Sequence, residues 1–277
     1  MNRLFTILCM VSMFVFHTSC NDSVMDIESP SVELKTRAVD QRVQNVIQQA
    51  RQGDVEAYNS LALCYRDGDG IEKSWLNMLC MYAIYCQKTG SDIEDIIELF
   101  EEGNPFRLIF ETVETSCSNE EIDAKIELLR LSAPAEAKAI EAAKNAFSLE
   151  DATSALNIIR EAEAEGSELA VIFQAAYYDQ ATDKTGQEEY LTRIAEQYPF
   201  FNQLLGDLYA KQYGDSDDFS YIQKAIECYY KADAYGMLLP KYANTLWGMY
   251  DYLGQKGLLE YDEQEVKRLK ILAKRKY

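Results

Sequence analysis

The chain has 277 residues, of which 46 are Asp or Glu and 27 are Lys or Arg, so its formal net charge is −19. A surface with this charge repels phosphate groups, which argues against nucleic-acid binding. The single histidine, His17, lies in the N-terminal segment. The rest of the chain therefore cannot form a Ser/His/Asp or Cys/His catalytic arrangement, and we expect a protein that is not an enzyme.

Residues 1–19 have the composition of a secretory signal peptide. Arg3 supplies a positive charge, and a mostly apolar run follows from Leu4 to Phe16. This run is too short to span a bilayer, so we predict that the segment directs export and is then removed.

The end of this segment, residues 17–20, resembles the lipobox of bacterial lipoproteins. The resemblance implies that Cys20 is acylated and becomes the new N-terminus, although His17 stands where the family prefers an aliphatic residue. The other interpretation is an ordinary signal peptide with an incidental Cys. Lipid attachment at Cys20 would place the protein in the cell envelope, anchored to the outer membrane on its periplasmic or its surface side.

Residues 20–36 contain many acidic, Ser and Pro residues and few large apolar ones. Such a segment cannot bury enough surface to offset the entropy of ordering, so we predict a flexible tether. Its acidic residues Asp22, Asp26 and Glu28 loosely resemble the surface-export signals of Bacteroidetes lipoproteins.

From residue 37 onward the pattern is helical, and no stretch alternates with period two for long enough to predict a strand. Apolar spacing, capping boxes and Pro at helix starts predict helices near 75–87, 104–117, 119–131, 134–147, 150–165, 168–181, 187–198, 200–212, 218–235, 238–253 and 262–276. No Pro/Gly/Ser-rich linker divides them. We therefore predict an all-α protein with a single domain over residues 37–277.

One helix-turn-helix pattern stands out near residues 46–88. It consists of small, aliphatic and aromatic residues at helical spacing, namely Ala50, Gly53, Ala57, Leu61, Tyr65, Gly68, Gly70 and Ile71. The pattern resembles the Sel1-like repeat, a relative of the tetratricopeptide repeat with about 36 residues per helical pair. The resemblance implies an α-α superhelix, in which each pair buries its apolar faces against its neighbours.

A second copy lies near residues 195–255. Its first helix repeats the signature in the segment 205–209, Leu-Gly-Asp-Leu-Tyr, and the segment 224–232 resembles the second helix of the family. Leu61 and Leu205 are 144 residues apart, which is four periods of about 36 residues. The residues between them match the pattern poorly, so we expect a degenerate middle.

Two further features have a structural and a chemical interpretation. The segment 67–70, Asp-Gly-Asp-Gly, fits a turn between repeat helices better than a calcium loop, because Met78 stands where an EF-hand needs a Glu.

Five cysteines remain beyond Cys20, and none forms a Cys-x-x-Cys pair; they are Cys64, Cys80, Cys86, Cys117 and Cys228. We expect small core residues, with a disulfide between two of them left open, and we predict no metal and no cofactor.

Aromatic residues are concentrated between residues 198 and 261, and the chain holds 19 Tyr and two Trp. Most should be core, but some can line a concave groove that holds a partner. The candidate groove residues are Tyr229, Tyr230, Tyr242, Trp247 and Tyr250. Since Sel1-like repeats mostly act as scaffolds, the resemblance implies a lipoprotein that binds a protein or peptide of the envelope. Exposed rings would also suit a glycan-binding accessory lipoprotein.

Overall fold

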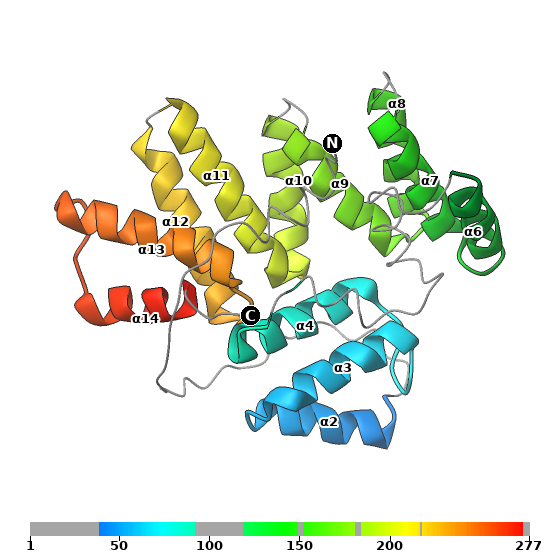
Figure 1. Cartoon of the computed structure of the whole chain (residues 1–277), viewed down its shortest axis with the longest axis horizontal. Coiled ribbons are helices and arrows are strands. Elements are labelled where there is room, and N and C mark those ends of the chain that lie inside the picture. Colours follow the sequence, from blue (N-terminus) through cyan, green and yellow to red (C-terminus); the bar gives the residue numbers. More distant parts are fainter. Residues whose placement is uncertain are drawn as a thin grey trace. The chain divides into compact units, whose positions relative to one another are not determined.

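The computed structural model describes residues 39–91, 93, 119–148, 152–180, 184–216 and 218–273, and these residues form helices and connections without any strand (Figure 1). The all-α prediction is confirmed for this part of the chain. The signal peptide, the tether, Cys20, Cys117 and the helix expected near 104–117 lie outside the described residues. None of the described helices is long and apolar enough to cross a membrane.

The helices divide into two compact units, which we describe separately. The middle unit comprises the described residues of 119–187. The terminal unit comprises residues 39–93 together with 188–273. The border between them falls within α10 (Lys184–Gln197), between Gln187 and Glu188. The prediction of a single domain over residues 37–277 stays a prediction.

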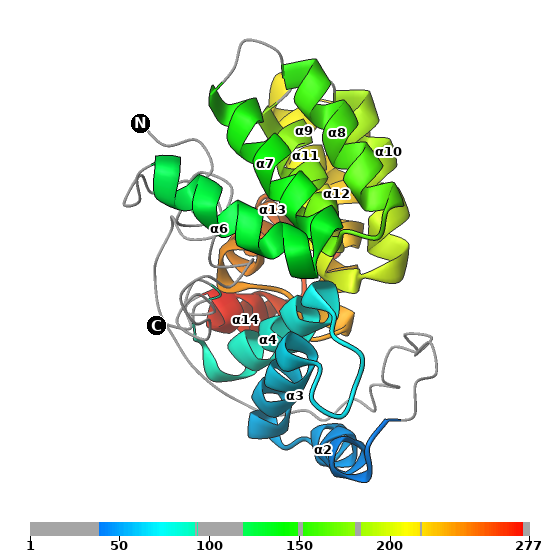
Figure 2. The same cartoon turned by 90° about the vertical axis from the view of Figure 1, so that its right-hand side faces the viewer.

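The middle unit is built from α6 (Asn119–Ser132), α7 (Pro134–Ser148), α8 (Ala152–Ala164), α9 (Glu168–Gln180) and the start of α10. Helix α6 packs on α7, α7 on α8 and α8 on α9, and α7 also contacts α9; Figure 2 shows α7 and α8 running side by side. Eight of its sixteen buried apolar residues are alanines, and Phe173 is the only aromatic one described. Small side chains allow these helices to approach closely.

A carboxylate in this unit caps a neighbouring helix. Glu136 on α7 accepts hydrogen bonds from the hydroxyl of Ser167 and from the amides of Glu168 and Leu169, at 2.5, 3.1 and 3.2 Å. The first amides of a helix have no partner within it, so this contact stabilises the start of α9 and joins it to α7.

The terminal unit contains two runs of helices. The first is α2 (Gln41–Arg51), α3 (Val55–Asp67) and α4 (Trp75–Thr89); the second is the end of α10, the short 3₁₀ helix η2 (Pro199–Phe201), α11 (Asn202–Ser216), α12 (Phe219–Ala234), α13 (Pro240–Gln255) and α14 (Glu263–Ala273). Sequential helices pack together from α2 to α4 and from η2 to α14, and α4 also contacts η2. Its core contains ten buried aromatic residues, in contrast to the alanine-rich middle unit.

In the N-terminal hairpin, which consists of α3 and α4, local sequence signals mark where the helices begin and where α3 ends. Asp54 and Ser74 act as N-caps, because their side chains accept hydrogen bonds from the amides of Glu56 and Asn77. The helix α3 ends at Gly68, whose φ of 71° lies in the left-handed region that glycine adopts without strain. The turn interpretation of residues 67–70 therefore agrees with the structure.

The C-terminal hairpin, α11 and α12, carries the second copy of the signature (Figure 1). Leu205 and Tyr209 are buried, and Gly206 lies directly against the ring of Tyr229 on α12. A Cβ atom at position 206 would come within 2.8 Å of this ring. Glycine is therefore required here for the close approach of the two helices.

Candidate functional site

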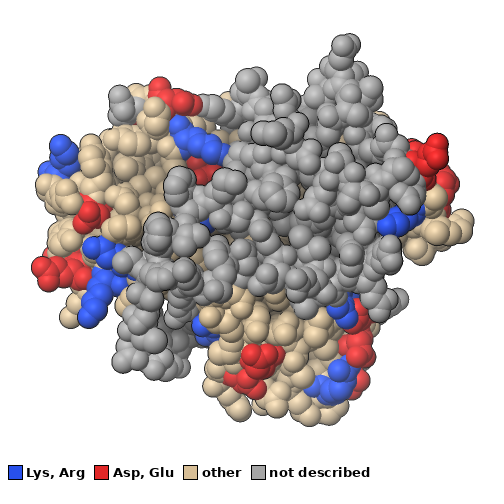
Figure 3. Space-filling view, viewed as in Figure 1, with Lys and Arg blue, Asp and Glu red and all other residues tan. Residues whose placement is uncertain are grey.

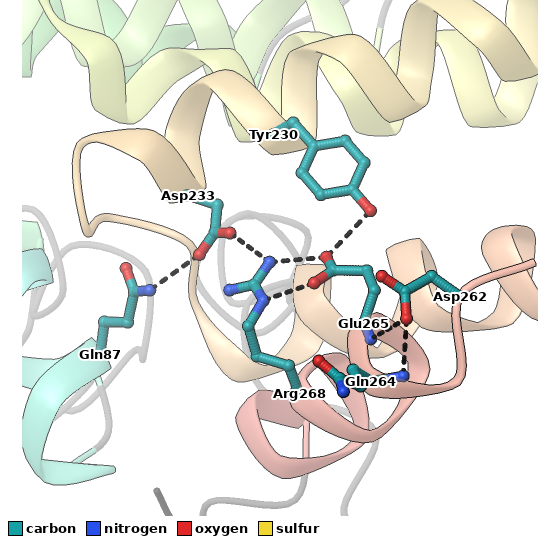
Figure 4. Close-up of polar contacts among 7 residues, drawn as sticks. All are labelled: Gln87, Tyr230, Asp233, Asp262, Gln264, Glu265 and Arg268. Carbon is teal, nitrogen blue, oxygen red and sulfur yellow. Dashed lines mark hydrogen bonds and ion pairs between the residues drawn. The ribbon is translucent and has the colours of Figure 1, made fainter. Parts of the chain in front are cut away.

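A polar cluster joins three helices of the terminal unit, and Arg268 on α14 lies at its centre (Figure 4). Its Nη2 donates to Oδ2 of Asp233 on α12 at 2.6 Å and to Oε1 of Glu265 at 2.7 Å, while its Nε donates to Oε2 of Glu265 at 2.7 Å. The guanidinium thus holds Glu265 in a two-point contact and reaches Asp233 as well. Such paired contacts fix the orientation of the planar group.

Burial and charge both shift the pKa values in this cluster. The side chain of Asp233 is 11% exposed and that of Glu265 is 20% exposed. Partial burial alone would raise the pKa of Glu265, but the hydrogen bonds and charge of Arg268 outweigh it and lower that pKa. The pKa of Arg268 is raised, most by the hydrogen bonds that Arg268 donates to Glu265 and further by the one that it donates to Asp233. One cation therefore pairs with both carboxylates, and the three groups together keep one net negative charge.

The cluster includes a second residue of α12 and one residue of α4. The hydroxyl of Tyr230 on α12 donates to Oε1 of Glu265 at 3.0 Å, and burial raises the pKa of this tyrosine. On α4, Nε2 of Gln87 donates to Oδ1 of Asp233 at 3.0 Å, and its Oε1 accepts from the amide of Leu238 at 2.8 Å. Gln87 therefore connects the N-terminal hairpin to the end of α12 and the start of the next connection.

The candidate groove prediction is wrong for three of its five residues. Tyr229, Tyr242 and Tyr250 are buried, with 0, 1 and 8% of their surface exposed. The rings of Tyr229 and Tyr242 lie 6.0 Å apart in the core. Because the three rings pack between α11, α12, α13 and α14, they stabilise the fold and present no surface to a partner.

The other two groove candidates, Tyr230 and Trp247, are partly buried by α14. Tyr230 binds Glu265, as described above, and Nζ of Lys270 lies 5.0 Å from the centre of the Trp247 ring. Two side chains of α14 thus contact the rings of these groove candidates. Helix α14 packs on α13 and reaches α12 through Glu265 and Arg268.

The structure instead exposes aromatic rings at the turn between α13 and α14, which Figure 1 shows at the left-hand edge. Tyr252 is 46% exposed, Leu258 58% and Tyr261 44%. We call these three residues the aromatic turn. The groove prediction did not include them, because it chose aromatic residues inside the helices of the repeat pattern. Their position beside Gly254 and Gly257, where a helix ends, is the sequence signal that could have indicated exposure.

Hydrogen bonds hold Tyr261 in place in the aromatic turn. Its ring lies against Gly254, where a Cβ atom would overlap it, and its hydroxyl donates to Oδ1 of Asp251 at 3.3 Å. Nearby, the hydroxyl of Tyr250 donates to the carbonyl of Glu260 at 3.1 Å. The turn is therefore attached to α13 at two points. Figure 3 shows acidic and basic side chains around uncharged surface over this end of α13 and α14.

The described residues offer little for metal or thiol chemistry. They contain no group of three His, Cys, Asp or Glu side chains placed to hold a metal ion. Asp67 pairs with Arg66 and Asp69 pairs with Arg42, at 2.7 and 2.6 Å. The four described cysteines are buried free thiols, namely Cys64, Cys80, Cys86 and Cys228. Burial raises the pKa of Cys228 to about 11, which keeps this thiol protonated at neutral pH.

No protein-family model matches the sequence, and no curated protein or solved structure shows significant similarity to the chain.

Proposed function

We propose that the chain is a non-catalytic exported lipoprotein that acts as a protein-protein interaction scaffold. The observation that carries this proposal is the aromatic turn, where Tyr252, Leu258 and Tyr261 are exposed at the end of stacked helical hairpins. Large apolar side chains that are exposed close together, rimmed by polar residues, mark interaction sites in soluble domains. Tyrosine suits this role because it supplies contact area together with a polar tip.

Two features of the sequence support the remaining parts of the proposal. The helical pairs resemble Sel1-like repeats, whose family mostly binds other proteins, and the N-terminal segment resembles a lipoprotein signal with Cys20 as the acylated residue. In this proposal the protein is anchored to the outer membrane, and its partner is a protein or peptide of the envelope.

The test is crosslinking in cells followed by purification of the full-length protein, with Cys20→Ala as the matched unanchored control. Metabolic labelling with a fatty-acid analogue should modify the original chain and leave Cys20→Ala unlabelled. We expect one discrete protein to be crosslinked to the anchored form. Labelling of both forms would contradict the anchor, and the absence of any crosslinked protein would contradict the scaffold.

A second function, glycan binding, uses the same exposed rings. Tyr252 is 46% and Tyr261 44% exposed, so a sugar can stack on the parts of the rings that Lys256 and Gly254 leave uncovered. Asp251 and Gln255 supply polar groups beside them. The discriminating measurement is calorimetry with neutral oligosaccharides. Binding of a sugar that Tyr252→Ala abolishes would favour this function over the scaffold.

A further inference from the structure

The charges around the aromatic turn are mainly negative. Between residues 251 and 263 the chain has four acidic residues and one basic residue, Lys256. Asp251 accepts hydrogen bonds from Tyr261 and Gln255, and Asp262 accepts from the amides that begin α14. These two carboxylates are therefore used within the fold.

The other two acidic residues, Glu260 and Glu263, are exposed. Neither carboxylate makes a hydrogen bond or ion pair with any described residue. The turn thus combines three apolar side chains with two carboxylates whose oxygens are open to solvent. A ligand that matches both features carries positive charge on an apolar stem.

Lysine side chains of the protein itself already contact its aromatic rings. Nζ of Lys224 lies 4.9 Å from the centre of the Tyr209 ring, Nζ of Lys270 lies 5.0 Å from that of Trp247, and Nζ of Lys256 lies 5.8 Å from that of Tyr252. Cations are attracted to the negative face of such rings, and Lys and Arg also cover apolar surface with their methylene stems. The exposed ring of Tyr261 offers such a surface to an external cation, and on Tyr252 an external cation takes the place of Lys256.

We propose that the aromatic turn binds a cationic segment of a protein partner, with Lys or Arg side chains on the rings of Tyr252 and Tyr261 and their charges near Glu260 and Glu263. The net charge of −19 favours approach of such a segment and repels anionic ligands. This inference rests on the proposed scaffold function and names the chemistry of its partner.

The test uses fluorescence anisotropy with the chain from residue 21 onward and a short labelled peptide of alternating Lys and Gly. Peptides of alternating Gln and Gly, and of alternating Glu and Gly, serve as probes of the same length. We expect binding of the Lys peptide alone, weakened by added salt. Equal binding of the Gln peptide would overturn the proposal.

The variants separate binding at the turn from general attraction to an acidic protein. Tyr252→Ala combined with Tyr261→Ala leaves the net charge unchanged, and we expect its Kd for the Lys peptide to rise about tenfold, about threefold for each ring. Tyr235→Ala, a partly buried tyrosine beyond α12, is the matched control and should leave Kd unchanged. An unchanged Kd in the double variant would overturn the proposal.

Folding is controlled with Tyr252→Ala alone, which keeps the bond between Tyr261 and Asp251 and should still raise Kd about threefold. Glu260→Gln with Glu263→Gln should weaken binding more than neutralisation of two exposed carboxylates elsewhere, Glu196→Gln with Glu227→Gln, which changes the net charge by the same amount; equal effects would count against the turn.

The experiments distinguish a failure of the cationic-segment proposal from a failure of the proposed scaffold function. If the full-length double variant retains the protein that the original chain crosslinks in cells, the scaffold stands and this inference falls. Binding of a neutral oligosaccharide that the double variant loses, with no binding of the Lys peptide, would overturn both in favour of a glycan.

Discussion

The N-terminal and C-terminal hairpins share one sequence signature, but different side chains lie at the contact between the two helices of each hairpin. The signature tyrosines, Tyr65 and Tyr209, are buried to the same extent, with 8 and 7% of their surface exposed. The small residue between the signature leucine and tyrosine is Ala62 in the first hairpin and Gly206 in the second. Gly206 is needed because the ring of Tyr229 fills the space where a methyl group would lie.

The surroundings of the two tyrosines also differ. Burial raises the pKa of Tyr65 to about 12. Burial and a hydrogen bond to Glu188 at 2.8 Å both raise the pKa of Tyr209, and Lys224 lies over its ring. The comparison shows that the signature determines which residues are buried, whereas the size and charge of the neighbours are adjusted separately in each hairpin.

The largest effect is expected where the second hairpin departs from the first. Tyr229→Ala should lower the free energy of unfolding by about 4 kcal/mol, because it removes a fully buried ring and leaves a cavity beside Gly206. Urea denaturation followed by circular dichroism measures this change. A loss below about 1 kcal/mol would show that the hairpin closes around the missing ring.

The next largest effect is expected where the two hairpins meet. Arg268→Ala leaves Asp233 and Glu265 without their cation in a partly buried position. Since Arg268 itself is 42% exposed, we expect a loss of about 2 kcal/mol at neutral pH, below the 3–5 kcal/mol typical of a fully buried pair.

This loss should depend on pH in a defined direction. Because the pKa of Glu265 is lowered in the folded protein, its contribution is complete above its ordinary value of about 4.3 and disappears as the pH falls through the lowered value. Denaturation at neutral pH and at about pH 3 should therefore show a difference between Arg268→Ala and the original chain that shrinks in acid. Lys267→Ala, an exposed neighbour on α14, should show no such trend.

A smaller effect tests the close contact at position 206 itself. Gly206→Ala should destabilise the protein by about 1 to 2 kcal/mol. The added methyl group overlaps the Tyr229 ring, and the free-energy cost of this overlap exceeds the gain in helix propensity. The control is Gly248→Ala on α13, where a Cβ atom would meet no atom within 4 Å. This variant should stabilise the protein by about 1 kcal/mol, so the two changes should have opposite signs.

The smallest effect compares the residues that begin the second helix of each hairpin. Ser74→Ala should cost about 1 kcal/mol at any pH, because a hydroxyl caps α4. Asp218→Ala should cost less. Since hydrogen bonding to Ser220 lowers the pKa of this exposed cap, the cost should be complete above the ordinary carboxyl pKa of about 4 and disappear as the pH falls through the lowered value. Thermal unfolding at neutral pH and in acid distinguishes the two caps.

Much of the helical layout could be predicted from the sequence. The ranges expected at 119–131, 134–147, 168–181 and 238–253 lie within two residues of α6, α7, α9 and α13 at each end. Apolar spacing and caps are local signals, so each helix carries its own pattern. The short helix η2 before α11 was missed, because Pro199 also suits the start of an ordinary helix.

The arrangement of the helices could not be predicted in the same way. The spacing of 144 residues suggests two repeats separated by several others, yet Gln87 of the first binds Asp233 of the second directly. The groove prediction failed for a related reason: Tyr229, Tyr242 and Tyr250 follow the repeat pattern, but whether a ring is exposed depends on distant helices. Only the structure shows that α14 covers Tyr230 and Trp247 and leaves Tyr252 and Tyr261 exposed.

The hydrogen bond between Gln87 and Asp233 has a consequence for how the chain folds during its synthesis. The two residues are 146 positions apart, so α4, with its buried Trp75, Leu76 and Met78, is made long before η2 and α12, which it contacts in addition to α3. Contacts of such large sequence separation form slowly and leave apolar surface uncovered in the meantime. In a chain that is still being synthesised, the N-terminal hairpin therefore leaves part of its apolar surface uncovered until the C-terminal helices have been made.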